Sequence, residues 1–302
     1  MRDGQPSRTA LGAAAYRAIH QAHEGGAIFV DPFAIKILDE ETRASLDQVA
    51  ADPARRPMRL LIVARSRFSE EALAASVACG VRQVVVLGAG LDTFSLRNPF
   101  AAQGVRVFEV DYPATQAWKR KRLAEAGLAI PASLTFAPVD FERQSLAEGL
   151  ARAGFQQDHP AFFQWLGVVP YLTREAISAT LDFVARVPRS AVVFDYTEPF
   201  ENHSPERRAR LMATAEQAAA RGEPWLSFFD PRELATLLRD KGFADIEDVG
   251  FAELVSPRAR RGPAARSRRP RDPRRALARS GTVCSGISSP SARSATASPP
   301  PW

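Results

Sequence analysis

The chain has 302 residues, 45% of them apolar, which is enough for one large α/β domain with a sizeable core. The formal net charge of +6 is unevenly distributed. Residues 257–302 hold eleven arginines and one acid, a charge of +10, so residues 1–256 carry −4. The basic character belongs to this tail, and the first 256 residues give no general reason to expect a nucleic-acid partner.

Metal-binding and export signals are missing from the sequence. Cys79 and Cys284 are too few for a disulfide framework, and with the four histidines they show no ligand spacing, so we expect no metal site. No stretch reaches about 18 apolar residues, and the N-terminus lacks the apolar core of a signal peptide. We therefore expect a soluble, cytoplasmic protein with no membrane partner; the oligomeric state is left open.

A helical N-terminal region precedes the first strand. Apolar periodicity predicts a helix over 9–23, the pair Asp31-Pro32 predicts a helix start leading into 33–38, and a longer helix is predicted over 58–78. The continuous apolar run 84–87 then predicts a strand buried on both faces of a parallel sheet. Gly88 and Gly90 follow it, where their missing side chains would let a ligand approach the backbone.

A second strand, 106–111, is predicted to end in Asp111, 21 residues after Gly90. A carboxylate at this place can accept hydrogen bonds from both ribose hydroxyls of an adenosine. Thr93 stands where the dinucleotide fingerprint requires a small residue. The pair of motifs therefore predicts a cofactor that contains adenosine, without deciding which one.

The remaining elements continue the alternation of helices and strands. A helix is predicted from Pro113, with the basic run 119–122 interpreted as a solvated face. Further strands are predicted at 133–139, 161–166, 191–196 and 245–249, and further helices at 146–153, 174 onward, 201–222 and 231–241.

Three ordered motifs resemble those of a known family. The runs V-V-V-L-G-A-G-L-D-T-F, F-E-V-D-Y-P and L-G-V-V-P-Y-L-T are similar to those of the leucine carboxyl methyltransferase-like family of class I S-adenosylmethionine-dependent methyltransferases. The likeness extends from about Arg8 to about Phe251. It implies a Rossmann-like methyltransferase sheet of seven strands, N-terminal helices that cover the cofactor, and S-adenosyl-L-methionine as that cofactor.

The resemblance also implies roles for particular residues, each beside a plainer alternative. It places the cofactor on Gly88, Ala89, Gly90, Asp111, Asp140 and Phe141. Asp140 would accept from the adenine amine with Phe141 against the ring; the alternative for Asp140 is a helix N-cap. Arg65 would hold the methionine carboxylate, or be an ordinary surface charge.

On the acceptor side, Tyr171 is the candidate catalytic residue, unless it only anchors its loop. The family often has a glutamate where this chain has Leu166, so the acceptor site is not a close copy. The histidines near strand ends form no recognisable pair, and no general base is assigned.

The C-terminal region departs from the family pattern. Class I methyltransferases have a further strand that runs antiparallel between the fifth and sixth, and only 282–287 could supply it. The rest of 257–302 is rich in arginine, proline and serine, which predicts a disordered tail after a methyltransferase domain at 1–256. A frame-shifted end and a genuine basic arm both remain open.

Three functions are compatible with these observations. The leading one is methyl transfer from S-adenosylmethionine to a small-molecule or carboxylate acceptor. The second is an NAD-dependent oxidoreductase, which shares the glycine turn and the acid but not the Pro-Tyr-Leu motif. The third is an inactive methyltransferase-like protein whose basic tail binds nucleic acid or anionic surfaces.

Overall fold

The computed structural model describes residues 7–140 and 143–255. Its centre is a sheet of five parallel strands in the order β3-β2-β1-β4-β5. The strands are β1 Gln83–Leu87, β2 Arg106–Asp111, β3 Leu134–Pro138, β4 Ala161–Trp165 and β5 Ala191–Phe194. The chain moves outward from β1 to β3 and then returns to the other side of β1 with β4. This reversal makes the carboxyl ends of β1 and β4 the place where an open α/β sheet binds ligands.

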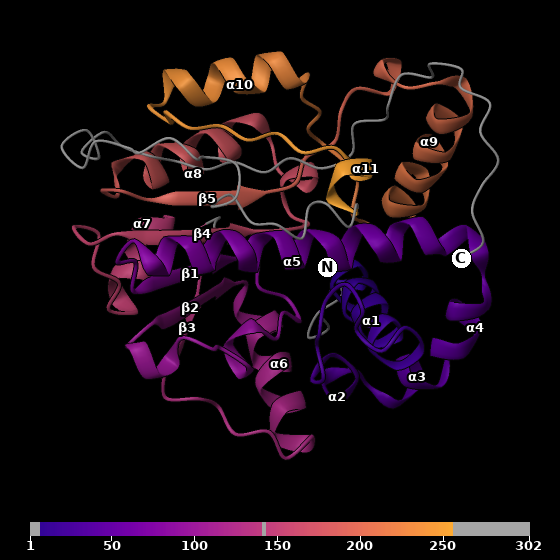
Figure 1. Ribbon diagram of the computed structural model, residues 1–302, viewed down its shortest axis with the longest axis horizontal. Helices are drawn as coiled ribbons and strands as arrows, with labels where there is room; N and C mark the ends of the chain where they lie inside the picture. Colours follow the sequence, from indigo (N-terminus) through magenta and orange to yellow (C-terminus); the bar gives the residue numbers. More distant parts are fainter. Residues whose placement is uncertain (1–6, 141–142, 256–302) are drawn as a thin grey trace.

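Helices cover both faces of the sheet and one of its ends. They are α1 Arg8–His23, α2 Ala34–Ile37, α3 Glu40–Ala44, α4 Leu46–Ala51, α5 Arg56–Ala78, α6 Pro113–Glu125, α7 Leu146–Arg152, α8 Arg174–Arg186, α9 Pro205–Ala220, α10 Pro231–Asp240 and α11 Phe251–Leu254. In Figure 1, α5 crosses one face of the sheet, and α1 to α4 gather at one end of it together with α9. No described helix combines the length and apolar character needed to cross a membrane.

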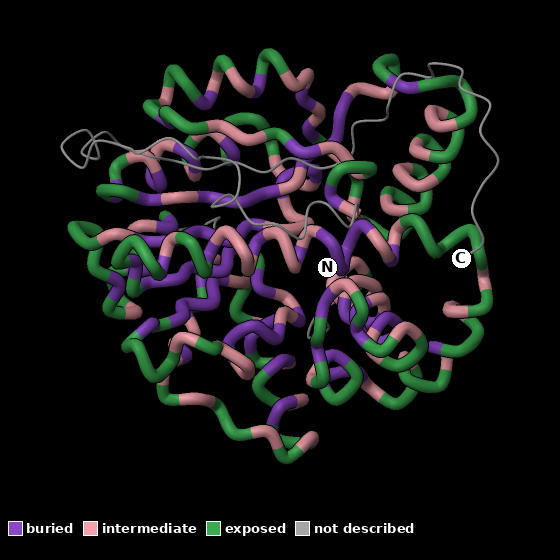
Figure 2. Tube along the Cα trace, viewed as in Figure 1, coloured by how far each residue is buried: buried purple, intermediate pink, exposed green. Residues whose placement is uncertain are grey.

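Successive side chains of β1 point to opposite faces of the sheet, so the strand contributes to a separate apolar cluster on each face. Val84 and Val86 pack in one apolar cluster with α5, whereas Val85 and Leu87 pack in another with α7, α8 and α10. All five residues of β1 are buried, as Figure 2 shows for the centre of the sheet. The continuous apolar run in the sequence therefore corresponds to a strand covered on both sides, as predicted.

A third apolar cluster attaches the N-terminal helices to the rest of the domain. Ile19 of α1 and Ile37 of α2 are fully buried and belong to the same cluster as Leu91, next to the glycine turn, and Leu123 of α6. The N-terminal region is thus packed against the segment that follows β1. The helical cover expected from the sequence is present.

The predicted sixth strand at 245–249 is wrong: in the described part of the chain this segment forms no strand. Val249 is buried in the same cluster as Val193 of β5, and the Tyr196 hydroxyl donates to Asp248 Oδ2 at 3.0 Å, but no backbone ladder forms. A strand needs a hydrogen-bonding neighbour, and in the family arrangement that neighbour is the antiparallel strand between the fifth and sixth. The candidate for it, 282–287, and the whole tail lie outside the described residues.

Candidate active site

A cavity of about 490 Å³ opens at the carboxyl ends of β1, β2 and β4. Its volume is in the usual range for a small-molecule site. The glycine turn and the end of β2 form one side, and α1, the segment after β4 and the segment after α9 form the other. Its lining includes Thr9, Ala10, Arg17, Arg65, Gly88, Ala89, Gly90, Asp92, Asp111, Gln164, Tyr171, Glu223 and Leu226.

The turn after β1 requires its glycines. Gly88 has φ of +64° and Gly90 has φ of +47°, a region that other residues rarely adopt. A Cβ atom on Gly88 would lie 2.5 Å from Cγ2 of Val168, and one on Gly90 would lie 3.0 Å from Cβ of Ala10. The two glycines therefore let the segment after β4 and helix α1 approach the turn closely.

Asp111 is held at the end of β2 by backbone donors. Its Oδ2 accepts from the Gly90 amide at 2.5 Å, and its Oδ1 accepts from the Tyr112 amide at 2.7 Å. Burial raises the pKa of this carboxyl above its ordinary value, although both amides act in the opposite direction. Gly88, Ala89, Gly90 and Asp111, predicted as one cofactor-binding group, line the same cavity.

Arg65 lies on the cavity wall and is paired within the protein. Its Nη1 donates to Asp195 Oδ2 at 2.5 Å, and the Gly167 amide donates to the other oxygen of Asp195 at 2.5 Å. A Cβ atom on Gly167 would lie 2.8 Å from Arg65 Nη2, so this glycine lets the guanidinium rest against the chain after β4. Arg65 Nε is buried and has no hydrogen-bond partner among the described residues.

A buried ionic network connects the N-terminal cover to the glycine turn. Asp31, fully buried, accepts from Arg17 Nε at 2.8 Å and from the Thr93 hydroxyl at 2.7 Å. Arg17 Nη2 also donates to the Leu91 carbonyl at 2.7 Å. The arginine lowers the pKa of Asp31 below its usual value, against the effect of burial. Thr93, which departs from the dinucleotide fingerprint, is thus used as a donor to the cover.

A second buried cation holds the same turn from α6. Lys119 Nζ donates to Glu109 Oε2 and to the Asp92 carbonyl, both at 2.6 Å, and both side chains are almost completely buried. Ser95 adds a hydrogen bond of 2.7 Å to the other oxygen of Glu109. Burial raises the pKa of Glu109. The sequence suggested a solvated face for the basic run 119–122, and for Lys119 that interpretation is wrong, because an acid on β2 lies directly beneath it.

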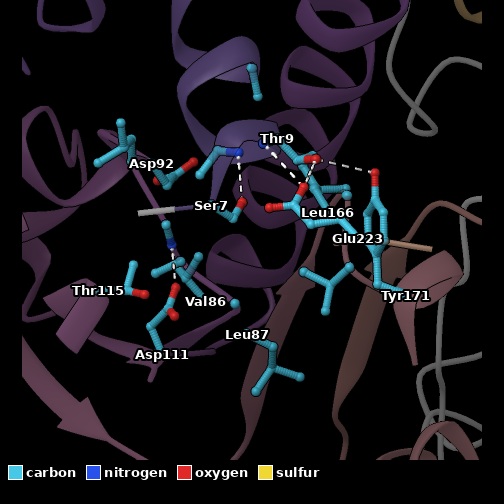
Figure 3. Close-up of a pocket in the computed structure, with 18 of the residues that line it drawn as sticks. Ser7, Thr9, Val86, Leu87, Asp92, Asp111, Thr115, Leu166, Tyr171 and Glu223 are labelled. Carbon is cyan, nitrogen blue, oxygen red and sulfur yellow. Dashed lines mark hydrogen bonds between the residues drawn. The ribbon is translucent and has the colours of Figure 1, made fainter. Parts of the chain in front are cut away.

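At the far side of the cavity, three side chains form a hydrogen-bonded chain (Figure 3). The Thr9 hydroxyl donates to Glu223 Oε2, and the Tyr171 hydroxyl lies 3.4 Å from the Thr9 oxygen. Glu223 also accepts from the backbone amides of Arg8 at 3.1 Å and Thr9 at 3.3 Å, at the start of α1. The segment after α9 is therefore fastened to the N-terminal cover beside Tyr171.

One predicted cofactor residue, Asp140, is not among the described residues that line the cavity. Asp140 follows β3, its Oδ2 lies 3.6 Å from Arg143 Nε, and its carbonyl accepts from the Arg143 amide. Phe141 lies outside the described residues. Within the described ranges, no group of three His, Cys, Asp or Glu side chains is arranged to hold a metal.

Sequence reasoning missed several residues that shape the site. Asp31 was recognised only as a helix start, and Arg17, Asp195, Gln164 and Glu223 were not assigned a role. Their roles depend on contacts between segments far apart in the chain, and no local pattern marks such contacts. For Glu109, an acid inside an apolar strand was a usable signal, since a buried acid requires a partner.

Comparison with known proteins identifies the family. The sequence profile described as leucine carboxyl methyltransferase matches residues 10–185, more than half of the chain. The chain belongs to this family. The family assignment made from the three motifs is thereby confirmed, and so is the class I, Rossmann-like fold.

Relatives of the leucine carboxyl methyltransferase family match most of the chain. The proposed S-adenosyl-L-methionine-dependent methyltransferase YktD of Bacillus subtilis is 32% identical over 285 residues, covering 83% of this chain and 93% of that protein. A proposed S-adenosyl-L-methionine-dependent methyltransferase from Mycolicibacterium paratuberculosis is 31% identical, covering 82% of this chain and 86% of that protein. A solved structure of a proposed methyltransferase from Thermobifida fusca aligns with a TM-score of 0.49 at 18% identity, covering 78% and 81%.

Proposed function

We propose that the protein is an S-adenosylmethionine-dependent methyltransferase that methylates a small-molecule acceptor in this cavity. Membership of the leucine carboxyl methyltransferase family and the names of both relatives support the cofactor. They also favour methyl transfer over the NAD-dependent alternative. The small-molecule acceptor is supported by the size of the cavity and by its apolar wall, to which Leu166, Val168 and Leu226 contribute.

The polar groups of the cavity match those of S-adenosylmethionine. That molecule has two ribose hydroxyls and an ammonium group that donate, a carboxylate that accepts, and a positive sulfur. Asp111, Asp92 and Gln164 offer acceptors, and Arg65 offers a cationic donor. Because both the donor set and the positive charge are matched, the residues fit the cofactor.

The observation that carries the proposal is a pair of unsatisfied buried atoms. Gln164 Oε1 and Arg65 Nε are each buried without a hydrogen-bond partner among the described residues, and both side chains line the cavity. An unmade hydrogen bond to a buried polar group costs about 1–3 kcal/mol, so such atoms usually have a ligand or water as their partner. The wall of the cavity thus contains one acceptor and one donor whose hydrogen bonds a bound cofactor would complete.

In this arrangement Asp111 would hold the ribose hydroxyls, and the backbone of Gly88, Ala89 and Gly90 would lie against the cofactor. Arg65 would bind the methionine carboxylate through the nitrogens that Asp195 leaves free. When bound, S-adenosylmethionine supplies a methyl group on a positively charged sulfur. The chain contributes orientation and exclusion of water, which are the main requirements for this displacement.

Calorimetric titration with S-adenosylmethionine, S-adenosylhomocysteine and NAD tests the proposal. We expect the first two to bind and NAD not to bind, and we expect Asp111→Ala to abolish binding. Asp158→Ala is the control, because it removes an exposed carboxylate from the loop before β4, outside the described cavity lining. Binding of NAD alone, or equal loss in both variants, would contradict the proposal.

A further inference from the structure

The charges around the cavity disfavour an anionic acceptor. The two cations of the described lining, Arg17 and Arg65, are each paired with an aspartate, Asp31 and Asp195. Three carboxylates of the lining, on Asp92, Asp111 and Glu223, have no cation in an ion pair with them among the described residues. Because Arg17 pairs with Asp31, and Arg65 would be engaged by Asp195 and the methionine carboxylate, the described lining leaves no further cation to compensate an acceptor carboxylate for its lost hydration.

The groups beside Tyr171 suit a hydroxyl acceptor instead. Since the Thr9 proton is used toward Glu223 Oε2, the Tyr171 hydroxyl is the donor in the contact of 3.4 Å with the Thr9 oxygen. The Tyr171 oxygen then keeps lone pairs that can accept a proton from a neighbouring hydroxyl. The hydrogen bonds thus point in one direction, from Tyr171 through Thr9 to the carboxylate of Glu223 (Figure 3).

We infer that the acceptor is an uncharged, largely apolar small molecule with a hydroxyl group, and that Tyr171, Thr9 and Glu223 carry its proton away. The inference rests on the proposed function and specifies its substrate class. Tyr171 is the catalytic residue that touches the acceptor, and Glu223 acts through Thr9. A carboxylate needs no base for methylation, whereas a hydroxyl does, so a route for the proton has a catalytic use only with a hydroxyl acceptor.

The step balances without a further reactant. The acceptor oxygen forms a bond to the methyl carbon while the carbon–sulfur bond breaks and its electron pair stays on sulfur. The hydroxyl proton passes to the Tyr171 oxygen, the Tyr171 proton to the Thr9 oxygen, and the Thr9 proton to Glu223. Glu223 is only half-buried, so it can return the proton to solvent.

Matched acceptor pairs test the substrate class. Phenol and benzoate, 2-naphthol and 2-naphthoate, and 1-decanol and decanoate are each incubated with the protein and methyl-labelled S-adenosylmethionine. Binding of each compound to the protein with S-adenosylhomocysteine is measured by calorimetry. We expect binding and methylation of hydroxyl members only. Methylation of a carboxylate member, or of no hydroxyl member, would overturn the inference. If the protein does not bind S-adenosylhomocysteine, the proposed function itself is contradicted.

Substitutions test the proton path on the better of the two phenolic acceptors, phenol and 2-naphthol, whose hydroxyl groups ionise at about pH 10. Glu223→Gln should lower kcat at pH 7 by about 100-fold, with recovery as rising pH ionises the acceptor, and should leave S-adenosylhomocysteine affinity within about two-fold. Asp39→Ala is the structural control: it removes a carboxylate that caps the Thr42 amide at the start of α3, outside the described cavity lining, so the wild-type pH profile should persist.

A second variant avoids any folding defect of Glu223→Gln. Thr9→Val interrupts the path while both backbone amides still hold Glu223, and it should reproduce the altered pH profile. A wild-type rate and pH profile in Thr9→Val and Tyr171→Phe would overturn the inference.

Discussion

The amide of Gly90 donates a hydrogen bond of 2.5 Å to Asp111 Oδ2, across 21 residues of sequence. The two elements that predicted an adenosine-containing cofactor are therefore joined before any ligand arrives. The bond fixes the carboxylate relative to the turn, so a bound ribose would meet a rigid acceptor. It also favours the ionised form of Asp111, because both of its oxygens accept from backbone amides and a proton on either oxygen would remove an acceptor position.

Affinity for S-adenosylhomocysteine should fall in mildly acidic solution. Burial raises the pKa of Asp111, so the carboxylate protonates at a higher pH than an ordinary aspartate and binding weakens as the pH falls through that raised value. Calorimetric titrations from pH 7.5 down to the limit of folding measure this. Asp111→Asn should bind weakly with little pH dependence; an identical pH profile in wild type and Asp111→Asn would contradict the role of this carboxyl.

Replacing Lys119 by methionine should destabilise the fold strongly at neutral pH. The substitution leaves Glu109, which is completely buried, without its cation. Removing one partner of such a buried ion pair costs about 3–5 kcal/mol. The already raised pKa of Glu109 would rise further, so stability is highest at low pH and is lost as the pH increases toward the folded-state value.

Urea unfolding of Lys119→Met at several pH values checks this dependence. The double variant Glu109→Gln with Lys119→Met removes the unpaired charge and should recover part of the loss. A deficit that is constant with pH would show that packing, and not the buried charge, is responsible.

Thr93→Val should lower the free energy of unfolding by about 2 kcal/mol, because it removes a hydrogen bond to the buried carboxylate of Asp31. It should also weaken S-adenosylhomocysteine binding, since the turn beside Gly90 loses one of its hydrogen-bonded connections to the cover. Thr180→Val is the control: its hydroxyl bonds only to the Ala176 carbonyl on an exposed helix surface, and less than about 0.5 kcal/mol is expected. Chemical denaturation of both variants provides the comparison.

Two glycine substitutions separate backbone strain from steric overlap. Gly104 has a φ of +79° and open space where a Cβ atom would lie. Gly104→Ala should therefore lower the free energy of unfolding only by the backbone strain, about 1–2 kcal/mol. Gly88→Ala adds the overlap with Val168 at 2.5 Å, so it should cost more and abolish cofactor binding. Adding Val168→Ala should return part of the stability. Equal losses in the two single variants would contradict the packing at Gly88.

The sequence predicted the elements whose signals are local. The buried run of β1, the glycine turn, the acid at the end of β2 and most helix starts were confirmed because each depends on neighbouring residues. The strand at 245–249 failed because forming it requires a partner strand elsewhere in the chain. The same limit hid Asp195 and Glu223: nothing near either residue indicates that one pairs with Arg65 and the other with the start of α1.

The network of Arg17, Asp31 and Thr93 has a consequence for protein engineering. Its members come from α1, from the segment before α2 and from the turn after β1, yet they share one carboxylate. A chimera that takes the N-terminal cover from a relative, in order to change acceptor preference, would leave either a buried charge or a buried hydroxyl unmatched. All three positions must be exchanged as a set, and residue 93 then belongs to the transplanted module although it lies 70 residues beyond the end of α1.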